Sequence, residues 1–101
     1  MADTRFHDDT ARRRYQLLAG DDEVGFIEYD LIGDTSILIK HTEVRPDREG
    51  QGLGSQLLAQ ALAHVRQQGR TVVPICPYAL AYIRRHAQHH ALVHEDLRRT
   101  L

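Results

Sequence analysis

The sequence predicts one small α/β domain of the α+β kind, built on a mixed, mainly antiparallel sheet flanked by helices. Three observations carry this prediction. β-branched and aromatic segments separated by short turns fill the first half of the chain, a glycine-rich loop leads into an amphipathic helix, and a short β-branched run precedes a second helix. The chain has 101 residues, of which 42% are hydrophobic. We therefore expect a single domain over residues 1–101, with room for one core.

Three antiparallel strands are expected before the glycine-rich loop, at residues 15–19, 24–32 and 36–44. Ile, Leu, Val, Tyr and Phe are frequent in each of them, and Gly33-Asp34 has the composition of a two-residue hairpin turn. Side chains alternate between the two faces of a strand. In the third strand this alternation predicts one face that runs from apolar to ionisable, formed by Ile37, Ile39, His41 and Glu43.

Two helices with a short strand between them are expected after the loop. Leu, Ala and Val recur at helical spacing over residues 53–65, and Gly69 stands at the position of a C-terminal cap. Residues 71–76 are rich in β-branched side chains, but Pro74 cannot donate a ladder hydrogen bond, which predicts an edge position or a frayed end. Pro77 suits the first position of the second helix.

The distribution of charge argues against nucleic-acid and membrane partners. The net charge is -1, and the 13 Lys and Arg residues are scattered apart from the run Arg12-Arg13-Arg14. This run is either a phosphate or nucleic-acid patch or a solvated strand edge, and the carboxylates nearby in the sequence favour the edge. No stretch approaches the roughly 20 apolar residues of a membrane span, and residues 1–15 are too charged for a signal peptide. The single cysteine, Cys76, excludes an intramolecular disulfide, so we expect a soluble, cytoplasmic protein.

The central motif is the segment Glu49-Gly50-Gln51-Gly52-Leu53-Gly54, which lies between the third strand and the first helix. Backbone N–H groups at a helix N-terminus, unobstructed by side chains, form a cradle for phosphate. The same glycines would also serve a sharp turn from strand to helix. A Walker loop is excluded because Ser55 follows Gly54 without a lysine, and the glycine spacing does not fit the dinucleotide fingerprint.

This loop resembles the central motif of the GCN5-related N-acetyltransferase superfamily, Gln/Arg-x-x-Gly-x-Gly/Ala, which binds the pyrophosphate of acetyl-CoA. Gly52, Leu53 and Gly54 match the motif, whereas Glu49 occupies the Gln/Arg position. A carboxylate cannot donate to a phosphate, so the resemblance implies binding through the backbone amides from Gln51 to Ser55, together with Arg48.

The resemblance extends from about Phe6 to Val93 through three further segments, at residues 41–44, 72–77 and 82–86. Together they are similar to the small, single-domain branch of the superfamily. The resemblance implies a mixed sheet flanked by helices, acetyl-CoA as the acyl donor and an amine as the acceptor. It also implies a short form that lacks the usual C-terminal strands around the acceptor. We therefore expect an acceptor side that is open or completed by a second subunit, in a monomer or weak homodimer.

Acetyl transfer to a primary amine requires a base, because an amine such as lysine has a pKa near 10.4 and is protonated at neutral pH. His41 and Glu43 are the candidates, since they share a strand face just before the loop. The alternative is a buried His41 that is hydrogen-bonded to Glu43 or to the backbone and only holds the strand. A backbone N–H near Val44 would meet the oxyanion.

Cys76 and Tyr82 are further catalytic candidates. The positive terminus of the helix that starts at Pro77 would favour a Cys76 thiolate, which permits an acetyl-cysteine intermediate; alternatively Cys76 packs as a small apolar residue. The resemblance implies that Tyr82 protonates the departing CoA thiolate, although core packing is the alternative for both Tyr78 and Tyr82. Arg84 and Arg85 either contact the phosphates of CoA or are solvated.

The C-terminal region is rich in histidine. His86, His90 and His94 recur at helical spacing, but no carboxylate or cysteine completes a metal site and residue 98 is not the second His of H-E-x-x-H, so no metal is expected. Residues 91–101 are mostly polar, with apolar anchors at Leu92, Val93 and Leu97.

The leading functional hypothesis is an acetyl-CoA-binding N-acetyltransferase that acts on a primary amine, either a protein lysine or a small amine. Two alternatives stay open. One is a non-catalytic module that binds acyl-CoA in a regulatory role, and the other is a structural interaction domain in which the glycines form only a turn.

Overall fold

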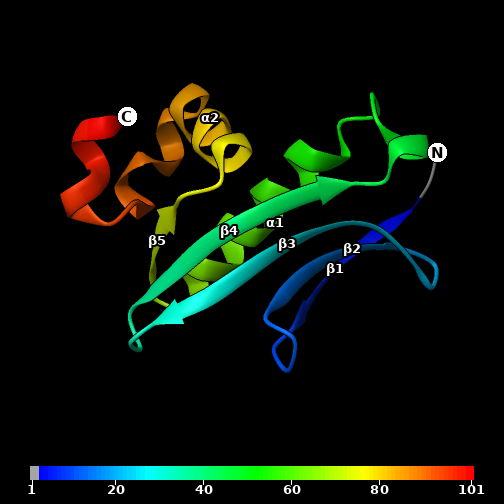
Figure 1. Ribbon diagram of the computed structural model, residues 1–101, viewed down its shortest axis with the longest axis horizontal. Coiled ribbons are helices and arrows are strands. Elements are labelled where there is room, and N and C mark those ends of the chain that lie inside the picture. Colours follow the sequence, from blue (N-terminus) through cyan, green and yellow to red (C-terminus); the bar gives the residue numbers. More distant parts are fainter. Residues whose placement is uncertain (1–2) are drawn as a thin grey trace.

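The computed structural model describes residues 3–101, in which one five-stranded sheet carries two α-helices (Figure 1). The strands lie in the sheet in their sequence order: β1 (Thr4–Asp9), β2 (Arg14–Ala19), β3 (Asp22–Ile32), β4 (Ser36–Val44) and β5 (Thr71–Pro74). Strands β1 to β4 pair antiparallel, and β5 pairs parallel to β4. The mixed, mainly antiparallel sheet is therefore confirmed, with β5 at the edge that its proline favours.

The α-helices are α1 (Leu53–Gln67) and α2 (Pro77–Arg85), and three 3₁₀ helices complete the fold: η1 (Pro46–Arg48), η2 (Ala87–Leu92) and η3 (Glu95–Thr100). Within the described residues no strand follows β5, and Val72 and Val93 form only an isolated parallel bridge. None of the helices in residues 3–101 is long and apolar enough to span a bilayer.

Strand β1 was not expected from the sequence, because Phe6 is its only large apolar side chain. It forms the edge of the sheet, and β2 lies one position further in. The arginine run lies at the turn between β1 and β2 and at the start of β2, which corrects its expected place on the sheet edge. Each of its guanidinium groups is paired with a carboxylate: Arg12 with Asp9, Arg13 with Asp30 and Arg14 with Glu23.

Helix α1 buries its apolar face against one side of the sheet and lies behind β3 and β4 in Figure 1. Its buried residues include the periodic set expected from the sequence, Leu53, Leu57, Leu58, Ala61, Leu62 and Val65. They share one core with inward side chains of the strands, such as Ile27 and Ile37. No helix within residues 3–101 crosses the opposite face of β1 to β4 in this view, so that face of the sheet is uncovered.

Strand β4 contains a bulge at Lys40 that corrects the expected pattern of its faces. Glu28 of β3 lies opposite His41, but Tyr29 lies opposite Ile39, so Lys40 has no partner residue. A bulge of one residue reverses the alternation beyond it. Ile39 is fully buried, whereas His41 and Glu43 lie on the exposed face and not on the face of Ile37 and Ile39.

The segment after β5 is anchored as expected. Within α2 the buried residues are Ala79, Tyr82 and Ile83, which recur at helical spacing. Beyond the helix, Leu92 and Val93 are buried in the core and Leu97 packs against it.

Candidate active site

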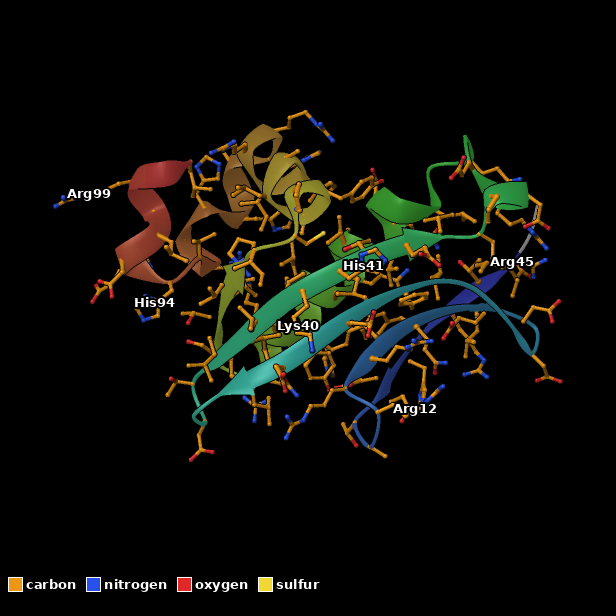
Figure 2. The ribbon with its side chains drawn as sticks, in the orientation of Figure 1. Arg12, Lys40, His41, Arg45, His94 and Arg99 are labelled. Carbon is orange, nitrogen blue, oxygen red and sulfur yellow. The ribbon has the colours of Figure 1, made fainter. Side chains whose placement is uncertain are left out.

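A cavity of about 480 Å³ lies where the end of β4, the glycine loop, the start of α1 and the start of α2 meet. Figure 2 shows His41 on the half of β4 that leads toward the loop, with Arg45 beyond the end of the strand. The lining residues come from these four segments: His41, Thr42, Glu43, Val44, Arg48, Glu49, Gly50, Gly52, Leu53, Gly54 and Tyr78.

The glycine loop leaves the N-terminus of α1 open toward this cavity. Gly50 and Gly52 have φ angles of 82° and 75°, in the left-handed region that glycine adopts without strain. Gly52 is the N-cap of α1 and has no side chain to cap the first turn. The backbone N–H groups of that turn have no partner within the helix and can therefore donate to an anion, and the helix dipole adds a favourable field.

Gly54 is needed for a different reason than the other two glycines. A Cβ at this position would lie 2.9 Å from Cζ and 3.2 Å from Cε1 of Tyr78, with the Tyr78 hydroxyl closer still. Tyr78 is 49% exposed and lines the cavity. Its ring therefore rests on the first turn of α1 and joins α2 to α1 across one wall of the cavity.

Strand β4 offers a free backbone edge to the cavity. The N–H groups of Ile75 and Cys76 both donate to the carbonyl of Ile39 at 3.1 Å, and β4 has no partner on this side beyond that point within the described residues. Arg45 donates in the opposite direction, to the carbonyl of Val24 on β3 at 2.9 Å. Because N–H groups alternate in direction along a strand, those of Val44 and Thr42 point to the free edge.

His41 and Glu43 form a hydrogen-bonded pair at one side of the cavity. The distance from His41 Nε2 to Glu43 Oε1 is 3.2 Å, and their side chains are 52% and 58% exposed. The expected alternative of a buried His41 is therefore wrong, although its hydrogen bond to Glu43 is confirmed. The ring also lies 6.0 Å from that of Phe26 on the uncovered sheet face. A carboxylate bound to one imidazole nitrogen orients the ring and leaves the other nitrogen available for proton transfer.

The charged side chains near the N-terminus of α1 are of both signs. Arg48 lines the cavity, and among the described residues it has no carboxylate partner. Arg45, close by, is already paired with Asp47 at 2.9 Å. Glu49 also lines the cavity and places a negative charge beside the open end of α1.

Two expected catalytic residues lie outside the lining of the cavity. Cys76 is 4% exposed and donates its S–H to Thr42 Oγ1 at 3.6 Å. Tyr82 is also 4% exposed, and its ring stacks on His86 at 4.1 Å between centroids. Burial raises the pKa of Tyr82 above its usual value, because the phenolate would lose its hydration.

The structure brings Tyr78, and not Tyr82, into the cavity. The sequence placed both on one helical stripe, but the buried face of α2 follows Ala79, Tyr82 and Ile83, and Tyr78 lies off that face. This spacing was the signal that could have separated the two tyrosines. The expected cofactor ligands divide in a similar way. Five of them line the cavity: Val44, Arg48, Gly52, Leu53 and Gly54. The other four do not line it: Gln51, Ser55, Arg84 and Arg85.

The histidines near the C-terminus are held by backbone carbonyls. His86 Nδ1 lies 2.7 Å from the carbonyl of Tyr82, and His90 Nε2 lies 3.0 Å from that of Ile83. Among the described residues no three His, Cys, Asp or Glu side chains are grouped as metal ligands would be.

The chain matches the family described as GCN5-related N-acetyl-transferase over residues 14–92. Its fold is similar to that of a GCN5-like protein from Staphylococcus aureus solved by NMR. The two share 19% sequence identity with a TM-score of 0.71, over 93% of this chain and 91% of that chain. None of the curated protein sequences compared with the chain matches it.

Two larger enzymes share the fold. The ribosomal-protein-S18-alanine N-acetyltransferase from Escherichia coli is 20% identical with a TM-score of 0.60, over 80% of this chain and 51% of that chain. A GNAT family acetyltransferase from Elizabethkingia anophelis, with acetyl-CoA bound, is 17% identical with a TM-score of 0.58, over 73% of this chain and 51% of that chain. The matched region is thus about half the length of each of these two enzymes.

The family match covers most of the chain and includes β2 to β5, the glycine loop and both α-helices. The structural similarities support the same fold independently of sequence identity. The chain therefore belongs to the GCN5-related N-acetyltransferase family, whose members are acetyl-CoA-dependent enzymes that acetylate amines.

Proposed function

We propose that this protein binds acetyl-CoA in the cavity between β4 and α1 and transfers the acetyl group to a primary amine, either a protein lysine or a small amine. The proposal rests on one observation: an uncapped helix N-terminus and a free strand edge face the same cavity. The N–H groups of the first turn of α1, together with Arg48, suit the diphosphate. The free edge of β4 suits the amide-containing pantetheine arm, which can pair with it as an added strand does.

In this orientation the thioester lies beside Thr42 and Val44, and the acceptor amine approaches His41. His41 accepts the proton that the ammonium group must lose, and Glu43 holds the imidazole ring in place. The N–H groups of Val44 and Thr42 stabilise the oxyanion that forms on the acetyl carbonyl. Tyr78 lines this cavity, but its hydroxyl lies against Gly54 in the first turn of α1, so its position suits contact with the diphosphate better than protonation of the departing thiolate that the sequence had suggested for Tyr82.

Direct transfer to the amine fits the site better than an acetyl-cysteine intermediate. Cys76 lies behind Thr42, is buried, and uses its S–H in a hydrogen bond. A nucleophile must reach the acetyl carbonyl at about 3 Å to 3.5 Å, which would require Thr42 to move aside.

The acceptor side is open. His41 and Glu43 are half-exposed and lie at the border of the uncovered sheet face, so nothing among the described residues encloses the acceptor. Such a site admits a lysine side chain on a protein surface as readily as a small amine.

The test combines binding and transfer. Calorimetric titration with CoA and acetyl-CoA should show a single site, and mass detection of acetyl transfer to a panel of amines and lysine peptides should show turnover. Transfer should fall at least 100-fold in His41→Ala and less in Glu43→Gln, with CoA affinity retained in both. Binding without transfer to any acceptor would instead favour a non-catalytic module, and Cys76→Ser serves as the control for the covalent route.

A further inference from the structure

The cavity has two chemically different ends. Arg48, Gly50 and the first turn of α1 form one end, and His41 and Thr42 form the other. If the phosphates of CoA occupy the first end, as proposed above, the acyl group must occupy the second. The following inference rests on that placement and concerns the size of the acyl group.

At its acyl end the cavity is lined by Thr42, close to the point where β4 and β5 converge. Ile75 and Cys76 hold the two strands together through their N–H groups, which share the carbonyl of Ile39. The next contact across the gap is the hydrogen bond from Cys76 Sγ to Thr42 Oγ1, at 3.6 Å. The gap between the strands therefore ends in side-chain contact at Thr42.

The Cys76 side of this contact lies in the hydrophobic core. Cys76 is 4% exposed and belongs to the same core as Ile39, Ala79 and Ile83, which are 0% exposed. Protein interiors are packed as densely as organic crystals, so an extra methylene must displace a neighbour. Thr42 is β-branched and stiff at χ1, and its hydrogen bond to Cys76 further fixes the side chain.

We infer that Thr42, held in place by Cys76, restricts the acyl donor to acetyl-CoA. We call Thr42 the acyl stop, because its side chain would block an acyl group longer than acetyl. Cys76 acts here through its volume and its hydrogen bond, and it forms no bond to the acyl group. One methylene in a close-fitting pocket changes discrimination by roughly 10-fold to 200-fold, which is the preference for acetyl-CoA over propionyl-CoA that the wild-type protein should show.

Three variants separate the effect of side-chain volume at residues 42 and 76 from the effect of their hydrogen bond. Cys76→Ala removes the support behind Thr42, and Thr42→Ser shortens the stop itself while keeping the hydroxyl. Cys76→Thr keeps a hydrogen-bond donor and nearly the volume of cysteine, and is the matched control. For each protein, calorimetry gives the dissociation constants of CoA, acetyl-CoA, propionyl-CoA and butyryl-CoA, and the measured quantity is the ratio of the propionyl-CoA constant to the acetyl-CoA constant.

The expected result is a ratio of at least 10 in wild type and Cys76→Thr, which falls at least fivefold in Cys76→Ala and in Thr42→Ser. CoA carries no acyl group, so its affinity should stay the same in wild type, Cys76→Ala and Cys76→Thr, and it reports the proposed cofactor site separately. Absence of CoA binding to wild type would overturn the proposed function and this inference together. Normal CoA binding with the same ratio in all four proteins would overturn the acyl stop alone. A drop in Cys76→Thr equal to that in Cys76→Ala would also overturn it, because volume would then not be the cause.

Discussion

An alanine at position 54 should destabilise the protein only while Tyr78 is present. The added Cβ would lie 2.9 Å from Tyr78 Cζ, closer than carbon atoms approach in folded proteins, so the tyrosine ring must move. Tyr78 is half-exposed, and its ring can swing toward solvent without disturbing the core. The ring would then leave the wall of the cavity.

The expected magnitude follows from two opposing effects. Overpacking costs about 1 to 3 kcal/mol, and the mobility of an exposed ring favours the lower part of that range. Replacing glycine by alanine within a helix contributes up to about 1 kcal/mol in the other direction. Gly54→Ala should therefore lower the free energy of unfolding by about 1 kcal/mol in wild type, and raise it by about 0.5 to 1 kcal/mol in a Tyr78→Ala background.

The assay is a double-mutant cycle measured by urea denaturation, with thermal unfolding as a second readout. A change of 1 kcal/mol corresponds to about 4 to 8 °C in Tm for a domain of this size. Tyr78→Phe gives a graded control, because it removes the hydroxyl but leaves Cζ and Cε1 in place. Equal effects of Gly54→Ala in the presence and absence of Tyr78 would refute the contact as the reason for this glycine.

Three further outcomes are expected. Glu49→Gln should tighten CoA binding about 3-fold to 10-fold at low salt and less at high salt. The reason is that a unit negative charge about 6 Å from a diphosphate in water is unfavourable by about 1 kcal/mol. Calorimetry at two salt concentrations measures this change. Asp8 accepts a hydrogen bond from the Tyr29 hydroxyl at 2.7 Å and lies 2.9 Å from His64 Nε2. Asp8→Asn should therefore lower the free energy of unfolding by about 1 to 3 kcal/mol in urea titrations. An unchanged midpoint would speak against this link between β1 and α1. Burial raises the pKa of Tyr15 and Tyr29 well above the unfolded value near 10, so the stability that these two groups contribute is fully present below pH 10. Above pH 10 the free energy of unfolding should fall by up to about 1.4 kcal/mol per pH unit for each tyrosine, with a shallower slope in Tyr29→Phe.

Composition and periodicity in the sequence were sufficient for most of the fold. The helix at residues 53–65 was predicted from its periodic apolar face, and the strands at residues 24–32 and 36–44 from apolar, β-branched and aromatic segments separated by turn residues. Strand β1 was missed because two of its three inward positions, Thr4 and Asp8, are polar. Asp8 satisfies its charge through Tyr29 and His64, residues that are distant in sequence.

The candidate site could be predicted in outline but not in its detailed geometry. The glycine loop, Arg48 and the pair His41 and Glu43 were identified from residue type and spacing. The bulge at Lys40 was not, because a single unpaired residue leaves no signal in the alternation of a strand that is exposed at one end. The exchange of Tyr82 for Tyr78 likewise depends on how α2 is rotated against the core.

The central claim is that the cavity between β4 and α1 holds the acyl donor, and an amide NMR titration with CoA tests it most directly. At 11.6 kDa the protein is small enough for every backbone amide to be followed. We expect the largest shifts at Gly50 to Ser55, where the diphosphate should bind, and at Thr42 and Val44 on the free edge of β4. Shifts confined to other parts of the chain, or none at millimolar CoA, would contradict the account.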